Sequence, residues 1–280
     1  MKLQAVTVCV NYADFFEQTG AANRGIFDKF VVVTDKKDTE VSELCKQFGY
    51  DCIQTDVFYE DGATFNKYAG INEGLKLIDS DAWVCFIDSD IVLQKDTRRV
   101  LENLGLIGSN LYGIDRVNCV GFEAWQKYKT GKGVLQENWM LTPAGLELGA
   151  RLVHYYGHHG ENGRFEGYRP VGFFQLCHRS AFDQYPQETK GADHCDLLFS
   201  RLWPRFKRVL IPELLGVHLE SERCGTGVNW YGRKSAPFKP RQIHQVDWIK
   251  TYMENGPFVE PKPVKLSFWQ KVSAFFNPAA

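Results

Sequence analysis

The chain has 280 residues, of which 44% are hydrophobic and 24% charged, and its net charge is −1. This length is enough to bury a large apolar core, and the near-zero net charge argues against binding to nucleic acid or anionic membrane through overall charge. The eight cysteines include no Cys-x-x-Cys pair, and disulfide frameworks are typical of shorter secreted chains. We therefore expect mostly reduced cysteines in a cytoplasmic protein.

The sequence shows no signal-peptide pattern at its start. Its apolar stretches are all shorter than the roughly 20 residues that span a bilayer. We therefore expect no transmembrane segment.

The first ninety residues alternate between strand and helix signals. Such alternation predicts a mainly parallel sheet flanked by helices, in which ligands bind beyond the carboxyl ends of the strands. Asp88 follows directly on the last of these strand signals. Strands are predicted at 5–10, 30–34, 52–55 and 83–87, and helices at 40–48 and 66–78.

The second half of the chain is less regular. From about 117 to 170 it is rich in Gly, Tyr and His, which predicts a loop-rich insertion instead of a separate domain. Strand signals return at 171–176 and 208–211, and a helix is predicted over 193–202. We expect one domain over 1–240, and a C-terminal extension over 241–280 with a short amphipathic helix near 266–276.

Asp88-Ser89-Asp90 is the first candidate for chemistry. Two carboxylates one residue apart can approach one Mg²⁺ or Mn²⁺ ion, which prefers oxygen ligands and neutralises charge on a departing diphosphate. Alone, the tripeptide is more typical of a solvated turn. Here it lies between the apolar run 83–87 and the apolar run 91–93, and this context favours a site.

The segments 65–75 and 83–90 together resemble nucleotide-sugar-dependent glycosyltransferases of the Rossmann-related GT-A fold, in family 2 and in the β-1,4-galactosyltransferase-like families. Those enzymes carry an Asn-Lys/Arg-x-x-x-x-Asn-x-Gly helix before a strand that ends in Asp-x-Asp. Asn66, Lys67, Asn72 and Gly74 match that helix. The resemblance implies a GT-A-like α/β fold, with the insertion on the acceptor side. It also implies metal-dependent transfer of a sugar from a nucleoside-diphosphate sugar to an acceptor hydroxyl, with inversion.

The resemblance also assigns roles at the donor side. Asp90 becomes a direct metal ligand, Asp88 contacts ribose or metal, and Asn66 and Lys67 lie near the donor. His218 becomes the third metal ligand and moves the preference from Mg²⁺ toward Mn²⁺. A histidine after a strand is otherwise most often structural.

Three further residues are implied in donor binding. Tyr12 would stack on the nucleotide base, and Asp35 would accept a hydrogen bond from a base N–H. Helix capping by Asp35 or Asp38 explains that region equally well. Gln175, in a glycine-rich strand, would bind a sugar hydroxyl.

The general base is ambiguous. The family presents an acid at the start of a helix, where it removes the proton from the acceptor hydroxyl. Aligned on the Gly-rich turn, the base is Asp193. Aligned on Asp196-Leu197, that position falls on His194, and Asp196 is a further alternative. Helix capping is the structural explanation for Asp193 and Asp196.

Arg233 and Lys234 lie in a basic, Gly-rich stretch that has the composition of a lid. These two cations would bind the leaving diphosphate. A solvated basic tail, or a site for a polyanion such as DNA, explains the same composition.

The acceptor stays open between a glycan, a lipid, a protein and a modified DNA base, with membrane-surface or polyanion contact through the basic C-terminal segment. One alternative function is a nucleotidyltransferase acting on sugar phosphates. It would need a Gly-rich basic loop after the first strand, and 11–15 has none. The other is a catalytically decayed sugar-binding or scaffold protein.

Overall fold

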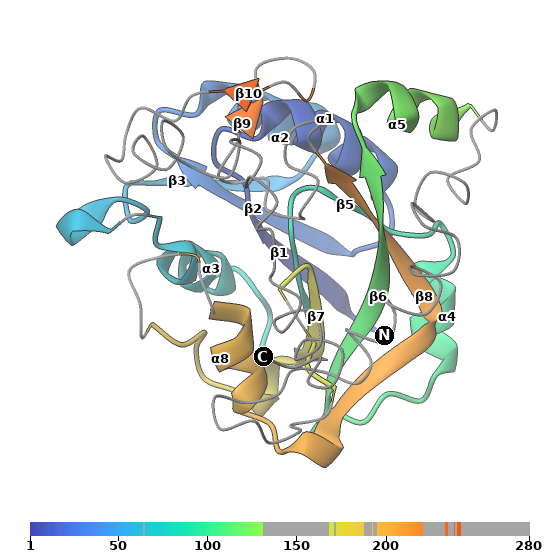
Figure 1. The fold of residues 1–280 in the computed structure, drawn as a ribbon. Helices are drawn as coiled ribbons and strands as arrows, with labels where there is room; N and C mark the ends of the chain where they lie inside the picture. Colours follow the sequence, from blue (N-terminus) through green and yellow to red (C-terminus); the bar gives the residue numbers. More distant parts are fainter. Residues whose placement is uncertain are drawn as a thin grey trace, which may run out of the picture.

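An eight-stranded sheet runs through the computed structural model of the protein (Figure 1). The structure describes residues 1–63, 65–130, 168–170, 172–187, 192, 195–220, 233–234, 238 and 240–241. In sheet order the strands are β3 (Asp51–Thr55), β2 (Lys29–Asp35), β1 (Leu3–Val8), β4 (Trp83–Ile87), β7 (Phe174–His178), β6 (Leu111–Val120), β8 (Arg208–Glu220) and β5 (Ile91–Val92).

Parallel pairing dominates the first half of this sheet. β3, β2, β1 and β4 are parallel neighbours, and β6 and β8 are also parallel. β7 runs antiparallel between β4 and β6, and β5 runs antiparallel to β8. The expected α/β fold with a mainly parallel sheet is confirmed, because four of the seven pairings are parallel.

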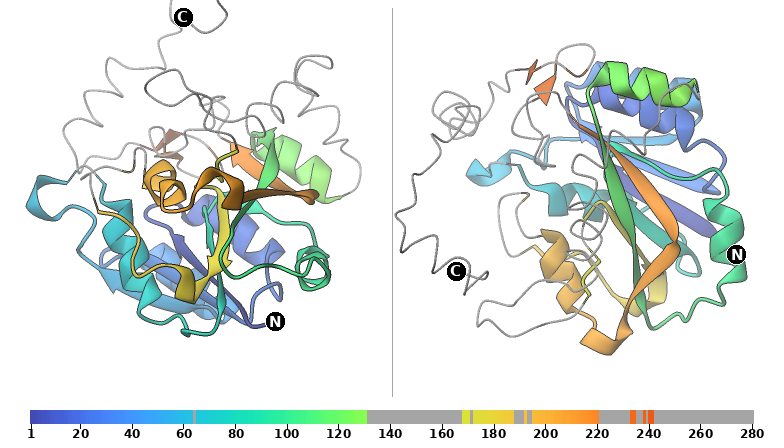
Figure 2. Two further views of the ribbon diagram at one scale, coloured as in Figure 1. Left: turned by 90° about the horizontal axis from the view of Figure 1, so that it is seen from below. Right: turned by 45° about the vertical axis from the view of Figure 1, so that its right-hand side comes forward.

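Helices cover both faces of the sheet (Figure 2). Val32 of β2 packs into one apolar cluster, while Val31 and Val33 pack into the other, as the two-residue period of a strand requires. The helices are α1 (Ala13–Ala22), α2 (Thr39–Phe48), α3 (Lys67–Leu75), α4 (Thr97–Asn103), α5 (Phe122–Lys129) and α8 (Cys195–Arg201), with short 3₁₀ turns η1 (Glu60–Gly62), η2 (Arg179–Ala181) and η3 (Arg205–Lys207).

α3 lies very close to the sheet. A Cβ added at Gly74 would come within 2.5 Å of Val6 Cγ1, and one added at Gly70 within 2.4 Å of Phe58 Cε1. Glycine at position 74 therefore lets the helix pack directly on β1, and glycine at position 70 makes room for the Phe58 ring, which follows β3. Because α3 connects the parallel strands β3 and β4, it begins at the carboxyl edge of the sheet, and Lys67 is its first residue.

Several elements differ from the predicted ones. β8 runs to Glu220, through His218, instead of ending near 211. β6 and α5 occupy 111–129, so regular structure extends well into the stretch whose pattern loosens at 117. Residues 131–167 and 242–280, with most of that stretch and the predicted C-terminal helix, lie outside the described residues.

The seven cysteines in the described part of the chain are free thiols. Within the same residues, no helix combines the length and apolarity needed to cross a membrane.

Candidate functional site

The carboxyl ends of β2 and β4 bring the predicted donor-side residues to one edge of the sheet. Asp35 is the last residue of β2, and Asp88 directly follows β4. One side chain of α1 and the C-cap residue of that helix hold the segment after β4 in place. The Thr19 hydroxyl donates to the Ser89 carbonyl at 2.6 Å, and the amide of the C-cap Asn23 donates to the Ile91 carbonyl at 2.8 Å. Both residues are buried, and the sequence carried no motif that marks them.

Asp90 and His218 are brought together by strand pairing. Ile91 of β5 pairs with His218 of β8, and the Leu219 N–H donates to the Asp90 carbonyl at 2.9 Å. As a result, His218 Nε2 lies 3.3 Å from Asp90 Oδ2, with side chains only 3% and 10% exposed. Two ligands of one Mg²⁺-sized ion, at bond lengths of about 2.1 Å and at right angles, lie about 3 Å apart. The pair therefore has a spacing that fits a shared cation.

Asp88 has a different partner. Lys67 Nζ lies 2.5 Å from Asp88 Oδ1, and both side chains are partly enclosed. Burial has the largest effect on the pKa of Lys67 and lowers it, but the charge and hydrogen bond of Asp88, together with Cys195 and Asp196, make the net direction upward. Burial raises the pKa of Asp88, Lys67 opposes this, and the neighbouring Asp90 raises it further. Burial and the neighbouring Asp90 thus both disfavour the charged form of Asp88, and Lys67 favours it.

In the described part of the chain, no three His, Cys, Asp or Glu side chains form a metal-binding group by themselves. Asp90 and His218, one carboxylate and one imidazole 3.3 Å apart, nevertheless suit a divalent cation. Asp88 as a third ligand stays a prediction.

Asp196 is the one candidate base within the described residues. It lies in the first turn of α8, where its Oδ2 accepts from the Gly172 N–H at 2.6 Å. Its charge acts on both Lys67 and Asp88, so it belongs to the same cluster of charged groups. Asp193 and His194 lie outside the described residues, and the choice of base among the three stays a prediction.

Gln175 is engaged within the protein. Its side chain is fully buried, and its contact with a sugar stays a prediction. Its Nε2 donates to the Pro170 carbonyl at 2.8 Å and to the Asp196 carbonyl at 2.9 Å, while its Oε1 accepts from the Tyr185 hydroxyl at 2.8 Å. Gln175 therefore ties the start of α8 to the chain before β7.

Asn66 is the N-cap of α3, where its Oδ1 accepts from the Ala69 N–H at 3.1 Å. Tyr12 is buried in the core beside Phe15, with ring centroids 5.5 Å apart. Both side chains thus have a packing or capping role in the fold. Asp38, and not Asp35, is the side chain that caps α2.

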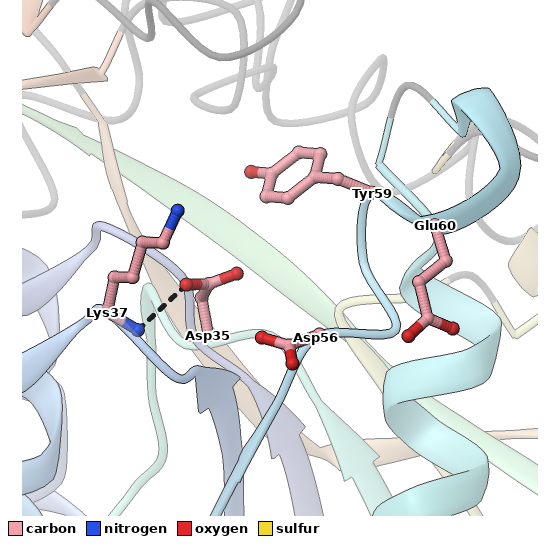
Figure 3. A pocket seen from close by; sticks show the side chains of 5 residues that line it. All are labelled: Asp35, Lys37, Asp56, Tyr59 and Glu60. Carbon is pink, nitrogen blue, oxygen red and sulfur yellow. Dashed lines mark hydrogen bonds between the residues drawn. The ribbon is translucent and has the colours of Figure 1, made fainter.

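A pocket of about 380 Å³ opens beyond β2 and β3. Figure 3 shows the side chains that line it: Asp35, Lys37, Asp56, Tyr59 and Glu60. Asp35 Oδ1 accepts from the Lys37 N–H at 2.9 Å. Tyr59 brings an aromatic ring to this pocket, a role that the sequence interpretation assigned to Tyr12. The sequence feature that could have indicated Tyr59 as a pocket residue is its position in a loop shortly after a strand.

Arg233 and Lys234 form β9 (Arg233–Lys234), which pairs antiparallel with β10 (Pro240–Arg241). Phe238, between the two strands, is fully buried and stacks on Phe15 with centroids 4.3 Å apart. Its N–H also donates to Asp14 Oδ2 at 3.2 Å. The hairpin is therefore anchored on the first turn of α1, just beyond the carboxyl end of β1.

The likeness found to known proteins is to solved structures of low sequence identity. No family model matches the chain, and no curated protein matches it in sequence. A mannosyl-3-phosphoglycerate synthase from Rubrobacter xylanophilus is 12% identical at a TM-score of 0.42, with 91% of this chain and 72% of that chain covered.

A glucosyl-3-phosphoglycerate synthase from Mycobacterium tuberculosis, solved with Mn²⁺, uridine-diphosphate-glucose and phosphoglyceric acid, is 15% identical at a TM-score of 0.42, with 78% and 71% covered. A mycobacterial protein is 13% identical at a TM-score of 0.38, with 78% and 65% covered, just under two thirds of its length. Likeness at these levels does not assign a function. The chain has an α/β fold. Its mainly parallel sheet, with β7 antiparallel beside β4 and helices on both faces, is what the GT-A resemblance implies.

Proposed function

We propose that this protein is a metal-dependent glycosyltransferase, which moves a sugar from a nucleoside-diphosphate sugar to an acceptor hydroxyl with inversion. The main support is the meeting of Asp90 and His218 beside the Lys67–Asp88 ion pair. Sequence motifs far apart in the chain predicted all four residues as parts of one donor site. A histidine that merely fills the core would not be expected to lie against Asp90.

The diphosphate would bind at this cluster. Asp88, Asp90 and His218 would hold Mn²⁺, or Mg²⁺, which supplies charge neutralisation for the departing diphosphate. Lys67, held against Asp88, adds a fixed positive charge at the same place. Arg233 and Lys234 would bind the leaving group from the hairpin anchored by Phe238.

The nucleotide base would bind in the pocket beyond β2 and β3. Its volume of about 380 Å³ is in the range of small-molecule sites. Tyr59 offers a ring surface for the base, and the Asp35 and Asp56 carboxylates can accept hydrogen bonds from base N–H groups.

The acceptor would approach from the side of α8. There Asp193, or His194 or Asp196 in its place, would take the proton from the acceptor hydroxyl as its oxygen attacks the anomeric carbon. The acceptor class stays open between glycan, lipid, protein and modified DNA base. The free thiols of the described residues suit a cytoplasmic enzyme.

The test is thermal unfolding with a panel of uridine, guanosine and thymidine diphosphate sugars, with and without Mn²⁺. We expect one donor class to stabilise the protein only with Mn²⁺, by about 2.7 kcal/mol at 100-fold its Kd. Lys67→Met should lose most of this effect, whereas Lys76→Met, at the exposed end of the same helix, should keep it. Stabilisation by no donor, with or without Mn²⁺, would contradict the proposal.

A further inference from the structure

The turn between α8 and β8 presents an exposed aromatic ring among cations. Phe206 is 81% exposed, the highest value for a large hydrophobic side chain in the described part of the chain, and Leu202 is 54% exposed. Arg205 and Lys207 flank Phe206, and between Asp196 and Glu213 the sequence has four cations (Arg201, Arg205, Lys207 and Arg208) and no acid.

This turn lies at the opposite end of the sheet from the candidate site. Arg208 opens β8 and pairs with Leu111, the first residue of β6. In Figure 1 the turn is at the bottom of the view, away from α1 and β9 at the top. Ile107, which is 59% exposed, stands shortly before Leu111 and adds an apolar side chain to this edge.

Cations dominate the sequence of this turn. The pKa of Arg208 lies below its usual value because burial disfavours its charge and Arg201 repels it. Positive side chains around exposed apolar ones match the surface of an anionic bilayer, where cations meet lipid phosphates and an aromatic ring enters the interface.

α5 carries the same local pattern, an aromatic residue between two cations, in a different setting. Tyr128 is only 37% exposed and its ring packs against Trp125. Lys127 pairs with Glu123, and Lys129 donates to Gln18. The ring of Tyr128 is thus much less exposed than that of Phe206, while both stand between two cations, which makes α5 a matched control.

We propose that the turn formed by Arg201, Leu202, Arg205, Phe206 and Lys207 docks the protein on anionic lipid bilayers. Phe206 inserts among the headgroups, and the cations contact lipid phosphates. The bound protein then presents the carboxyl edge of the sheet, with the candidate site, away from the bilayer. Docking is thus independent of the proposed catalytic activity.

Vesicle co-sedimentation of the full chain tests this. Vesicles of phosphatidylcholine with phosphatidylglycerol should bind the protein, vesicles of phosphatidylcholine alone should not, and added salt should weaken binding. Each cation near an anionic surface contributes about a fivefold gain in affinity, so Arg205→Glu with Lys207→Glu should weaken binding by about 25-fold or more. Phe206→Ala should weaken it about tenfold.

The control variants are Tyr128→Ala, and Lys127→Glu with Lys129→Glu, which should bind as the unaltered protein does. All substitutions are at solvent-accessible side chains, and circular dichroism checks that each variant folds. Three results would overturn the proposal: no binding to anionic vesicles, unchanged binding by the Phe206 and Arg205/Lys207 variants, or Phe206-dependent association with RNA or with a second copy instead of vesicles.

Discussion

Asp88 and Asp90 stand one residue apart and have unlike partners. Asp88 is paired with the Lys67 ammonium from α3, and Asp90 lies against the His218 imidazole from β8. The two carboxylates therefore contact side chains from two elements far apart in the sequence, α3 and β8. Only the family resemblance predicted that Asp90 and His218 belong to one site, because neither spacing nor composition links these two residues.

Tyr50 gives a residue-scale prediction about pH. Its hydroxyl donates to the Gly20 carbonyl at 2.7 Å, and burial raises its pKa from 10.0 to about 12. The unfolded chain releases this proton near pH 10.0, whereas the folded chain keeps it to about 12. The stabilisation is therefore complete below pH 10.0 and is lost as the pH rises to about 12.

Tyr50→Phe should lower the free energy of unfolding by about 1 kcal/mol at neutral pH, through the lost hydrogen bond. It should also lose less stability than the unaltered protein between pH 10.0 and about 12. Urea unfolding across this range measures both effects. Equal alkaline losses in the two proteins would mean that Tyr50 does not carry this pH dependence.

At the scale of elements, α3 is the part that connects core packing to the site. Gly74→Ala would place a Cβ 2.5 Å from Val6 Cγ1 and 3.0 Å from Val33 Cγ2. We expect it to lower the free energy of unfolding by about 1–3 kcal/mol, because the packed core resists extra volume. Glu73→Ala, one residue earlier on the same helix, is the control and should cost about 0.5 kcal/mol or less. Urea unfolding of Gly74→Ala within the range of the control would show that α3 tolerates the added volume.

The same elements show what sequence could predict. β4 was predicted at its observed bounds because its five residues are all apolar and are followed directly by polar ones. The strand predicted at 208–211 was too short because Pro212 and Glu213 interrupt its apolar pattern. In the structure, pairing with β6 extends β8 to Glu220. α1 was missed because its start has no side-chain cap and its apolar periodicity is weak.

The candidate site was predictable to a similar degree. Motifs indicated Lys67, Asp88, Asp90 and His218, which the structure brings together as two pairs. The donor roles of Gln175 and Asn66 stay predictions, and the sequence could not show that the polar groups of both residues also make hydrogen bonds inside the protein. Tyr59 was not predicted as a site residue, because only the folded loop after β3 brings its ring to the pocket.

At the scale of the whole molecule, the two ends of the sheet differ in chemistry. The carboxyl edge carries the acidic cluster and the pocket, while the amino edge near η3 carries Phe206 and its cations. This separation lets metal binding and lipid docking be measured independently, and a variant at one end should leave the other unchanged.

The central claim is that Asp90 and His218 hold a divalent cation for a diphosphate donor. Electron paramagnetic resonance of free Mn²⁺ measures this directly, because the signal of the hydrated ion falls as the ion binds. With a donor nucleoside diphosphate present, the unaltered protein and the exposed control Asp81→Asn should bind Mn²⁺ equally. Asp90→Asn and His218→Gln should each bind it at least about tenfold more weakly, as losses in a metal's coordination environment do. Mn²⁺ binding by Asp90→Asn at full strength would contradict the account.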